Sequence, residues 1–217
     1  MNQRTITVKG TGRVSAKPDL VVIEMNLETT KRDYAQTLEL ATAELDSLRT
    51  ALVAVGHDDK ALKTASFNIQ TKYESYKKND EWKQRFVGYT CTHGLSLEFD
   101  LDMPTLGRTL GAITECKAAP RFNIQFSVKD PEAVKEQLLE NAVRNAAEKA
   151  KILAKAAGVN LGVITHIEYS WGDLRLYSET DMKVCECEAA APKDLAMDIE
   201  PDDIDASDNV TVVWTIE

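Results

Sequence analysis

The sequence lacks a surplus of basic residues, and this absence excludes one class of partners. Its 217 residues include 26 lysines and arginines against 35 aspartates and glutamates, which gives a formal net charge of −9. Proteins that bind nucleic acids gain much of their affinity from contacts between basic side chains and phosphates. We therefore expect no nucleic acid among the partners of this chain.

The chain also lacks long apolar runs. No stretch approaches the roughly 20 apolar residues that a transmembrane helix requires, so we expect no transmembrane segment. The first residues, MNQRTITVKG, contain neither the apolar core nor the small-residue cleavage site of a secretion signal. This pattern predicts a cytoplasmic protein. The alternative is a cell-envelope or secreted protein whose leader has been removed.

Cysteine is scarce. The four cysteines, Cys91, Cys116, Cys185 and Cys187, are too few for a disulfide scaffold in a chain of this length. Cys185 and Cys187 are the candidates for a metal site, but structural zinc requires a second pair of ligands and a wider spacing within each pair. We expect two thiols in a loop, no bound metal and no cofactor. The alternative is a thiol-responsive or metal-responsive sensor.

Complete glycine motifs for phosphate binding are missing. Gly10 and Gly12 are separated by one residue, but Ser15 stands where a dinucleotide fingerprint has its third glycine. Pro18 and a second predicted strand follow, whereas phosphate binding requires the start of a helix at this point. We infer that the two glycines shape a strand or permit close backbone packing.

Regular patterns are present along most of the chain. In some segments apolar and polar residues alternate, as in half-buried strands. Between these segments, apolar residues recur at the spacing of a helix. Asp130 and Pro131 predict the start of a long helix that ends at Gly158, and alanines dominate its apolar stripe. Strands are expected over 5–14, 20–30, 62–77, 86–100, 121–130, 163–177 and 209–217, and helices over 34–55, 104–116 and 131–157.

The order of these elements predicts an α+β protein with a weak internal repeat. A strand, a long helix that ends at a glycine, and two further strands occur in residues 19–100 and again in residues 121–217. We expect two β-α-β-β units, with antiparallel sheets packed against two long helices. Residues 101–120 join the units and contain a short connecting helix.

Four segments in this order carry a family resemblance. They are ITVKGTGRVSAKPDLVVIEMNL, VGYTCTHGLSLEF, AVRNAAEKAKILAKAAGVNLGVITHIEY and IEPDDIDASDNVTVVWTIE. Together they resemble the SIMPL-domain family of bacterial proteins, the domain of unknown function 541, over nearly all of residues 1–217. The resemblance implies a single SIMPL-like domain, no agreed catalytic residues, and associations with stress tolerance and self-assembly. Pro201-Asp202 departs from the Pro-Gly that is frequent in such proteins.

The predicted hairpin between residues 62 and 100 mixes basic and aromatic residues at its tip. Lys72 to Phe86 contains five basic and three acidic residues. Aromatic residues on a hairpin typically pack across strands or at a subunit contact, so we expect an interaction surface here. Its candidate residues are Tyr73, Tyr76, Trp82 and Arg85.

A late segment has the opposite charge. Between Glu186 and Asp208, nine acidic residues accompany a single lysine, Lys193. Within it, the run PDDIDASD lacks the central glycine of a calcium-binding loop, so we expect a solvated acidic loop. The two opposite charges predict head-to-tail association between subunits, which makes a homo-oligomer or a protein partner the expected assembly.

Catalytic constellations are not recognisable. Nucleophilic catalysis needs a histidine beside a serine or cysteine, whereas His57 follows a predicted helix, and His93 and His166 lie in predicted strands. We expect a non-enzymatic, self-associating protein that acts through assembly or partner binding. The alternative is an enzyme with an unidentified site between the two units. Its candidate acids are Glu24, Glu98 and Asp100.

Overall fold

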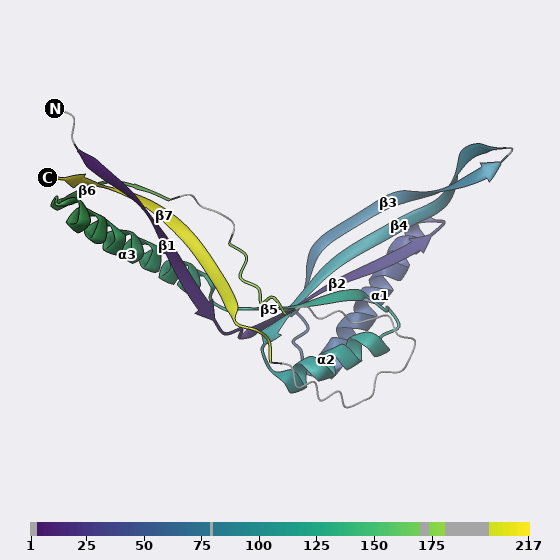
Figure 1. Cartoon of the computed structure of the whole chain (residues 1–217). Coiled ribbons are helices and arrows are strands. Elements are labelled where there is room, and N and C mark those ends of the chain that lie inside the picture. Colours follow the sequence, from purple (N-terminus) through teal and green to yellow (C-terminus); the bar gives the residue numbers. More distant parts are fainter. Residues whose placement is uncertain (1–3, 79, 170–173, 181–199) are drawn as a thin grey trace. The chain divides into compact units, whose positions relative to one another are not determined.

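The computed structural model describes residues 4–78, 80–169, 174–180 and 200–217 (Figure 1). Its helices and strands belong to two compact units, each built on one sheet. Unit 1 contains β1, α3, β6 and β7, and unit 2 contains β2, α1, β3, β4, α2 and β5. The elements are β1 (Thr5–Ala16), β2 (Leu20–Lys31), α1 (Tyr34–Ala54), β3 (Leu62–Lys78), β4 (Glu81–Asp100), α2 (Met103–Glu115), β5 (Arg121–Ser127), α3 (Pro131–Ala157), β6 (Leu161–Glu168) and β7 (Ile204–Ile216). The predicted α+β class is confirmed. The predicted short helix is present as α2, but it does not join the two units, because it belongs to unit 2 and connects β4 to β5 of the same sheet.

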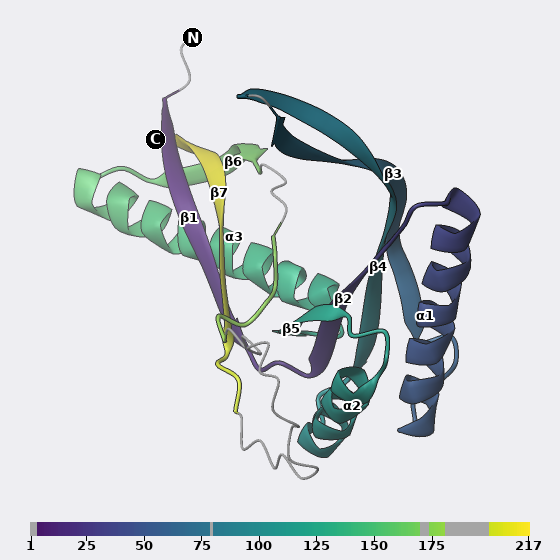
Figure 2. The ribbon, with the colours of Figure 1, turned by 90° about the vertical axis from the view of Figure 1, so that its right-hand side faces the viewer.

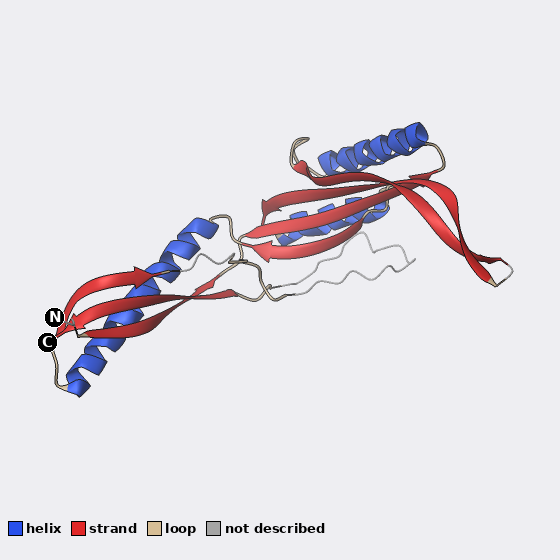
Figure 3. Ribbon diagram, turned by 90° about the horizontal axis from the view of Figure 1, so that it is seen from above, coloured by secondary structure: helices blue, strands red, loops and turns tan. Residues whose placement is uncertain are grey.

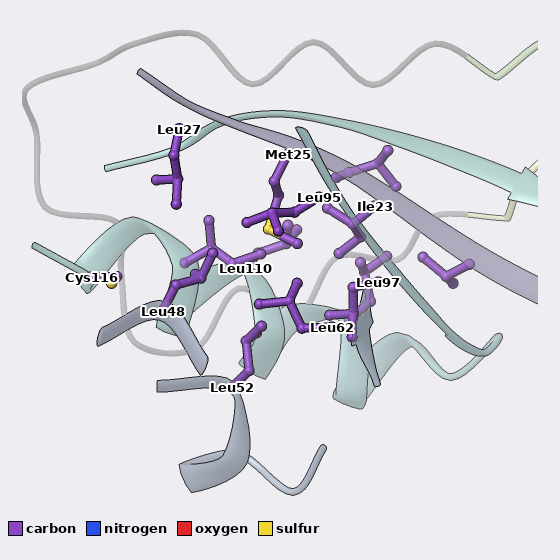
Figure 4. Close-up of a cluster of buried hydrophobic side chains, with 14 of the residues drawn as sticks. Ile23, Met25, Leu27, Leu48, Leu52, Leu62, Leu95, Leu97, Leu110 and Cys116 are labelled. Atoms are coloured by element: carbon purple, nitrogen blue, oxygen red, sulfur yellow. The ribbon is translucent and has the colours of Figure 1, made fainter. Parts of the chain in front are cut away.

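Unit 2 is held together by large aliphatic side chains. Its sheet has the order β3-β4-β2-β5, and β4 pairs antiparallel with both β3 and β2. Leu48 and Leu52 of α1 and Leu110 of α2 pack on Ile23 and Leu95 of the sheet (Figure 4). Burying each such side chain contributes about 1.5–3 kcal/mol, so this cluster is the main source of stability in unit 2.

Unit 1 has two buried clusters, each smaller than that of unit 2, and alanines supply most of the buried side chains of its helix. Its sheet has the order β1-β7-β6, and α3 lies beside β1 and β7 (Figure 2). The N-cap side chain of Asp130 accepts a hydrogen bond from the backbone nitrogen of Ala133, and α3 ends at Gly158, where φ is 68°. Both predicted helix boundaries are therefore confirmed. The buried stripe of α3 is Val134, Leu138, Ala142, Ala146, Ala150 and Ala154.

Gly10 and Gly12 bring the β1 backbone into direct contact with α3. A Cβ atom at Gly12 would lie 2.0 Å from the carbonyl oxygen of Leu138, and one at Gly10 would lie 2.1 Å from that of Ala142. No side chain fits in this space, so the glycines and the alanine stripe permit one close approach. The interpretation of close backbone packing is confirmed.

Three side chains of α3 cover the outer edge of β1. The backbone nitrogen of Thr11 donates to Oδ1 of Asn145 at 3.0 Å. Asn141 Nδ2 donates to the Arg13 carbonyl at 3.1 Å, and Lys149 Nζ donates to the Lys9 carbonyl at 3.1 Å. Residues 141, 145 and 149 share one flank of the helix, because they are spaced by about one turn. They supply partners to backbone groups that a neighbouring strand would otherwise use.

The predicted acidic loop is partly wrong. Ile204 to Asp208 already belong to β7, where Ile204 and Ala206 are buried and Asp205 is exposed. Asp205 accepts a hydrogen bond from Ser15, and Asp208 accepts one from the Tyr169 hydroxyl. The period of two that marks a strand was hidden by the density of acidic residues.

Other strand ends differ from the predictions as well. The hairpin strands reach Lys78 and Glu81, so the tip is much shorter than the predicted polar segment. Asp80 makes the turn with φ at 61°, a conformation that aspartate tolerates better than most residues. β6 ends at Glu168 rather than at residue 177, and Tyr177 makes only an isolated bridge with Ser127.

The internal duplication of residues 19–100 and 121–217 stays a prediction. The order strand, helix, strand, strand is found in β2, α1, β3 and β4. β5 belongs to the second predicted repeat, residues 121–217. In the structure it lies beside β2, a strand of the first predicted repeat, in the sheet of unit 2. β1, which lies outside both repeats, pairs with β7 in unit 1.

Candidate interaction surface

The hairpin of unit 2 extends beyond the rest of its sheet. β2 pairs with β4 only as far as Lys31 opposite Tyr89, whereas β3 and β4 continue to pair with each other up to the tip. We call the resulting two-stranded ribbon, Tyr73–Lys78 with Glu81–Phe86, the arm (Figures 1 and 3). Two-stranded ribbons are marginally stable on their own, so interactions within the arm and with partners matter.

One face of the arm is aromatic. Tyr73 lies opposite Phe86, and Trp82 lies opposite Lys77 on the same face because alternate residues of a strand share a face. The Tyr73 and Phe86 rings meet edge-on, with centroids 5.7 Å apart. Trp82 is 74% exposed, the highest value among the large hydrophobic residues described.

The opposite face of the arm carries paired charges. Arg85 donates to Glu74 through both Nε and Nη2, the latter at 2.8 Å. The hydrogen bond and the charge of Glu74 raise the pKa of Arg85 above its usual value. The Arg85 guanidinium also lies 6.0 Å from the ring centroid of Tyr76. Exposed ion pairs contribute little to stability, so this pair mainly orients Arg85.

A bulge continues the aromatic row toward α1. Lys72 pairs with Gly88 and Tyr73 with Phe86, so Val87 has no partner. An extra residue places side chains three positions apart on one side, and the Phe86 and Tyr89 rings meet at 5.5 Å. Tyr89 in turn meets Tyr34, the first residue of α1, at 5.5 Å.

Gly88 is required at this point of the sheet. A Cβ atom there would lie 2.2 Å from the carbonyl oxygen of Lys31, the last residue of β2. The end of β2 therefore packs directly on the backbone of β4, at the place where the arm begins.

The four residues predicted for the surface are all exposed, and the structure divides them between the two faces. Tyr73 and Trp82 lie on the aromatic face, whereas Tyr76 and Arg85 lie on the charged face. The row of Phe86, Tyr89 and Tyr34 was not predicted. Phe86 was detectable as part of the basic and aromatic tip, but its contact with Tyr89 depends on the bulge.

Two histidines make hydrogen bonds inside unit 2. His57 Nε2 lies 2.6 Å from the Thr109 hydroxyl, and His93 Nε2 lies 2.9 Å from the Thr64 hydroxyl. Burial lowers the pKa of both side chains, and a nearby arginine, Arg108 or Arg49, adds to the effect. Both histidines thus favour the neutral form. His57 links the segment after α1 to α2, and His93 links β4 to β3.

The other chemical candidates are spread over the chain. Burial raises the pKa of the Cys91 thiol, which disfavours the reactive thiolate. Glu24, Glu98 and Asp100 are exposed on β2 and β4. Within residues 4–78, 80–169, 174–180 and 200–217, no group of His, Cys, Asp and Glu could hold a metal ion. Cys185 and Cys187, with most of the acidic segment from Glu186, lie outside the described residues.

The sequence comparison places the chain in a family. The model of the SIMPL family, described as a protein of unknown function (DUF541), matches residues 6–214. The chain belongs to the SIMPL family. The resemblance found in the four sequence segments is thereby confirmed.

Named relatives of this SIMPL protein come from two bacterial genera. The 26 kDa periplasmic immunogenic proteins of Brucella melitensis and Brucella abortus are each 28% identical to it over 167 residues, or 75% of this chain. The chain covers 65% of the length of each Brucella protein. An uncharacterized protein, YggE of Edwardsiella ictaluri, is 23% identical over 215 residues, which is 97% of this chain and 86% of the relative.

The predicted cytoplasmic location is wrong by this comparison. Both Brucella relatives are named periplasmic proteins, in agreement with the alternative of a cell-envelope or secreted location. The first residues alone are therefore no guide to the compartment of a protein of this family. In the described part of the chain, no helix combines the length and apolar character needed to cross a membrane.

Proposed function

We propose that this SIMPL protein is a non-enzymatic protein that self-associates and acts through assembly or partner binding in the periplasm, with a stress-related role. The observation that carries the proposal is the arm. It presents Tyr73, Trp82 and Phe86 on a ribbon that no other strand of its sheet supports. Aromatic residues are enriched in the cores of protein interfaces, where they contribute much of the binding energy.

The charge of the arm supports a second copy as its partner. The segment from Lys72 to Phe86 has two more basic than acidic residues, whereas the whole chain has a formal net charge of −9. A second copy is therefore an acidic partner for a basic, aromatic element. Electrostatic complementarity of this kind speeds association and weakens as salt screens it.

The location in the periplasm is supported by the names of the Brucella relatives. In that compartment, an assembly formed by surface contacts needs no cytoplasmic energy source or cofactor. The stress-related role rests on what the family resemblance implies. Comparison of a deletion strain with its complemented strain under oxidative and acid stress would test it, and equal survival would contradict it.

Light scattering coupled to size-exclusion chromatography tests the role of the arm. We expect the wild-type protein to elute as an oligomer at low salt and to dissociate as salt rises. The double variant Tyr73→Ser/Trp82→Ser should dissociate at much lower salt, because it loses the aromatic face. Tyr177→Ser is the matched control, since it removes an exposed tyrosine of unit 1. A strict monomer at low salt contradicts the proposal.

A further inference from the structure

The aromatic face of the arm carries no carboxylate from either of its strands. By the pairing register, this face consists of Tyr73, Ser75, Lys77, Trp82, Gln84 and Phe86. Three of these residues are aromatic, two are polar and uncharged, and one is a lysine. Glu74 and Glu81, the acidic residues of the two arm strands, lie on the opposite face. The formal charge that the strands place on the aromatic face is therefore positive.

A lysine stands at each end of the aromatic row. Near the tip, Lys77 lies opposite Trp82. At the base, the exposed Lys31 lies opposite Tyr89, whose ring meets the ring of Phe86. The row thus combines rings along its length with ammonium groups at its two ends.

Lys77 is ion-paired but accessible. Its Nζ lies 2.7 Å from a carboxylate oxygen of Asp80 in the turn, and the two side chains are 56% and 93% exposed. Exposed ion pairs contribute little to stability, and an ammonium group has three donors. Asp80 therefore leaves Lys77 with donors for a second anion.

This combination of side chains is typical of residues at a membrane–water interface. Trp and Tyr rings concentrate at the level of the lipid headgroups, because one end of each side chain is apolar and the other is polar. Lysine buries its apolar stem and keeps its charge in the polar layer. Trp82 is 74% exposed and Tyr73 is 55% exposed, so both rings are accessible to such a surface.

The charge distribution of the chain favours an anionic surface at the arm. The segment from Lys72 to Phe86 has two more basic than acidic residues, whereas the whole chain has a formal net charge of −9. An anionic membrane attracts basic segments near its surface and repels acidic ones. The arm is therefore the part of the described chain that such a surface draws toward itself.

We propose that the aromatic face of the arm binds the surface of an anionic phospholipid membrane; this rests on the partner binding proposed above. Trp82, Tyr73 and Phe86 enter the headgroup layer, and Lys77 and Lys31 contact lipid phosphates. The carboxylates of the arm strands stay on the side that faces water. The same face serves the contact between copies, so a membrane and a second copy compete for it.

Two charge reversals test which face of the arm meets the lipid. Lys77→Glu and Lys83→Glu change the net charge equally, and each breaks one exposed ion pair, with Asp80 or with Glu81. Lys77 lies on the aromatic face and Lys83 on the charged face. In flotation with vesicles of phosphatidylglycerol and phosphatidylethanolamine in equal parts, we expect Lys77→Glu to bind about tenfold more weakly. Lys83→Glu should lose about threefold at most, because salt screens charges over about 10 Å.

Quenching by lipid tests whether the arm enters the interface. Vesicles brominated near the headgroup end of their acyl chains quench a tryptophan that lies against them. We expect quenching in the wild type and little in Trp82→Phe, which keeps an aromatic ring on the face but removes this reporter. The comparison isolates Trp82 from the other two tryptophans of the chain. Circular dichroism shows whether each variant folds as the wild type does.

The outcomes separate this inference from the self-association proposed above. An oligomeric wild type that does not bind the anionic vesicles overturns the membrane contact and leaves self-association standing. A wild type that binds the vesicles but is monomeric at every concentration overturns self-association and leaves the membrane contact standing. Equal losses in Lys77→Glu and Lys83→Glu, equal binding to vesicles of phosphatidylcholine alone, or equal quenching in the wild type and Trp82→Phe would each overturn the proposal.

Discussion

The two units are packed by opposite means. In unit 2, large side chains such as Leu48, Leu97 and Phe126 fill the space between sheet and helices. In unit 1, Gly10 and Gly12 remove side chains from β1, so that α3 contacts the strand backbone. One chain thus stabilises one sheet with large buried side chains and the other with a close approach of helix and strand backbones. This difference predicts opposite sensitivities to mutation: unit 2 should fail when atoms are removed, and unit 1 when atoms are added.

The largest effect is expected from Gly12→Val. The new Cβ would lie 2.0 Å from the Leu138 carbonyl oxygen, and rotation of the side chain cannot relieve a clash with backbone. We expect unit 1 to lose about 3 kcal/mol or more of stability. Hydrogen exchange followed by mass spectrometry should show faster exchange in β1, α3 and β7, with α1 and β2 unchanged.

Gly111→Ala is the control for adding a methyl group at a glycine. Gly111 lies within α2, and apart from its chain neighbours and the nearby backbone of its own helix, no heavy atom lies within 4 Å of the position its Cβ would take. Alanine is a better helix former than glycine, so this variant should gain up to about 1 kcal/mol. A similar loss in both glycine variants would contradict the account of unit 1.

Leu48→Ala tests unit 2 from the other side. Leu48 is fully buried between α1 and the sheet, and truncation leaves a cavity. We expect a loss of about 2–5 kcal/mol in urea unfolding, with exchange faster in α1, β2 and β4. Ala51→Gly, a partly buried position three residues along α1, should cost only about 1 kcal/mol. Spread of the Leu48→Ala effect into α3 would show that the units are not independent in stability.

Acid should weaken unit 2. The pKa of His57 and of His93 is lowered in the folded protein from the usual 6.5, mainly by burial. The unfolded chain therefore takes up protons first, and the stability present above pH 6.5 is lost as the pH falls toward the folded pKa values. Urea midpoints at pH 8, 6 and 5 measure this loss. The variant His57→Gln/His93→Gln should lose less between pH 8 and 5, and an equal loss would assign the effect to other groups.

The smallest effect is expected at the edge of β1. Asn145→Ala removes the acceptor for the Thr11 backbone nitrogen and should cost about 1 kcal/mol. Gln137→Ala, at an exposed position of the same helix, is the control and should change little. Thermal unfolding measures both, and equal melting temperatures for the two variants would show that the hydrogen bond from Thr11 to Asn145 does not stabilise the edge of β1.

Much of the fold is predictable because its signals are local. The caps at Asp130 and Gly158 define α3, and the alternation in β2 and β4 defines two strands of unit 2. The partner of β5 is not predictable in this way. Nothing in its seven residues favours β2 over a strand of unit 1, since pairing depends on residues far away in the chain.

The candidate surface likewise has features that local sequence predicts and features that depend on strand pairing. The exposure of Tyr73 and Trp82 follows from their place at a hairpin tip, which the sequence predicts. Their separation from Tyr76 and Arg85 onto another face depends on strand register, and the contact of Phe86 with Tyr89 depends on a bulge. In α3, Ala154 is buried whereas the neighbouring, larger Leu153 is exposed, and the size and hydrophobicity of the two residues do not predict this order.

The central claim is that the exposed surfaces of this chain bind other chains, so its native mass is the most direct measurement. Sedimentation equilibrium of the wild-type protein should give a mass that is a multiple of 24.1 kDa at low salt and moves toward one subunit as salt rises. A mass of one subunit at low salt and at every concentration tested would contradict the claim.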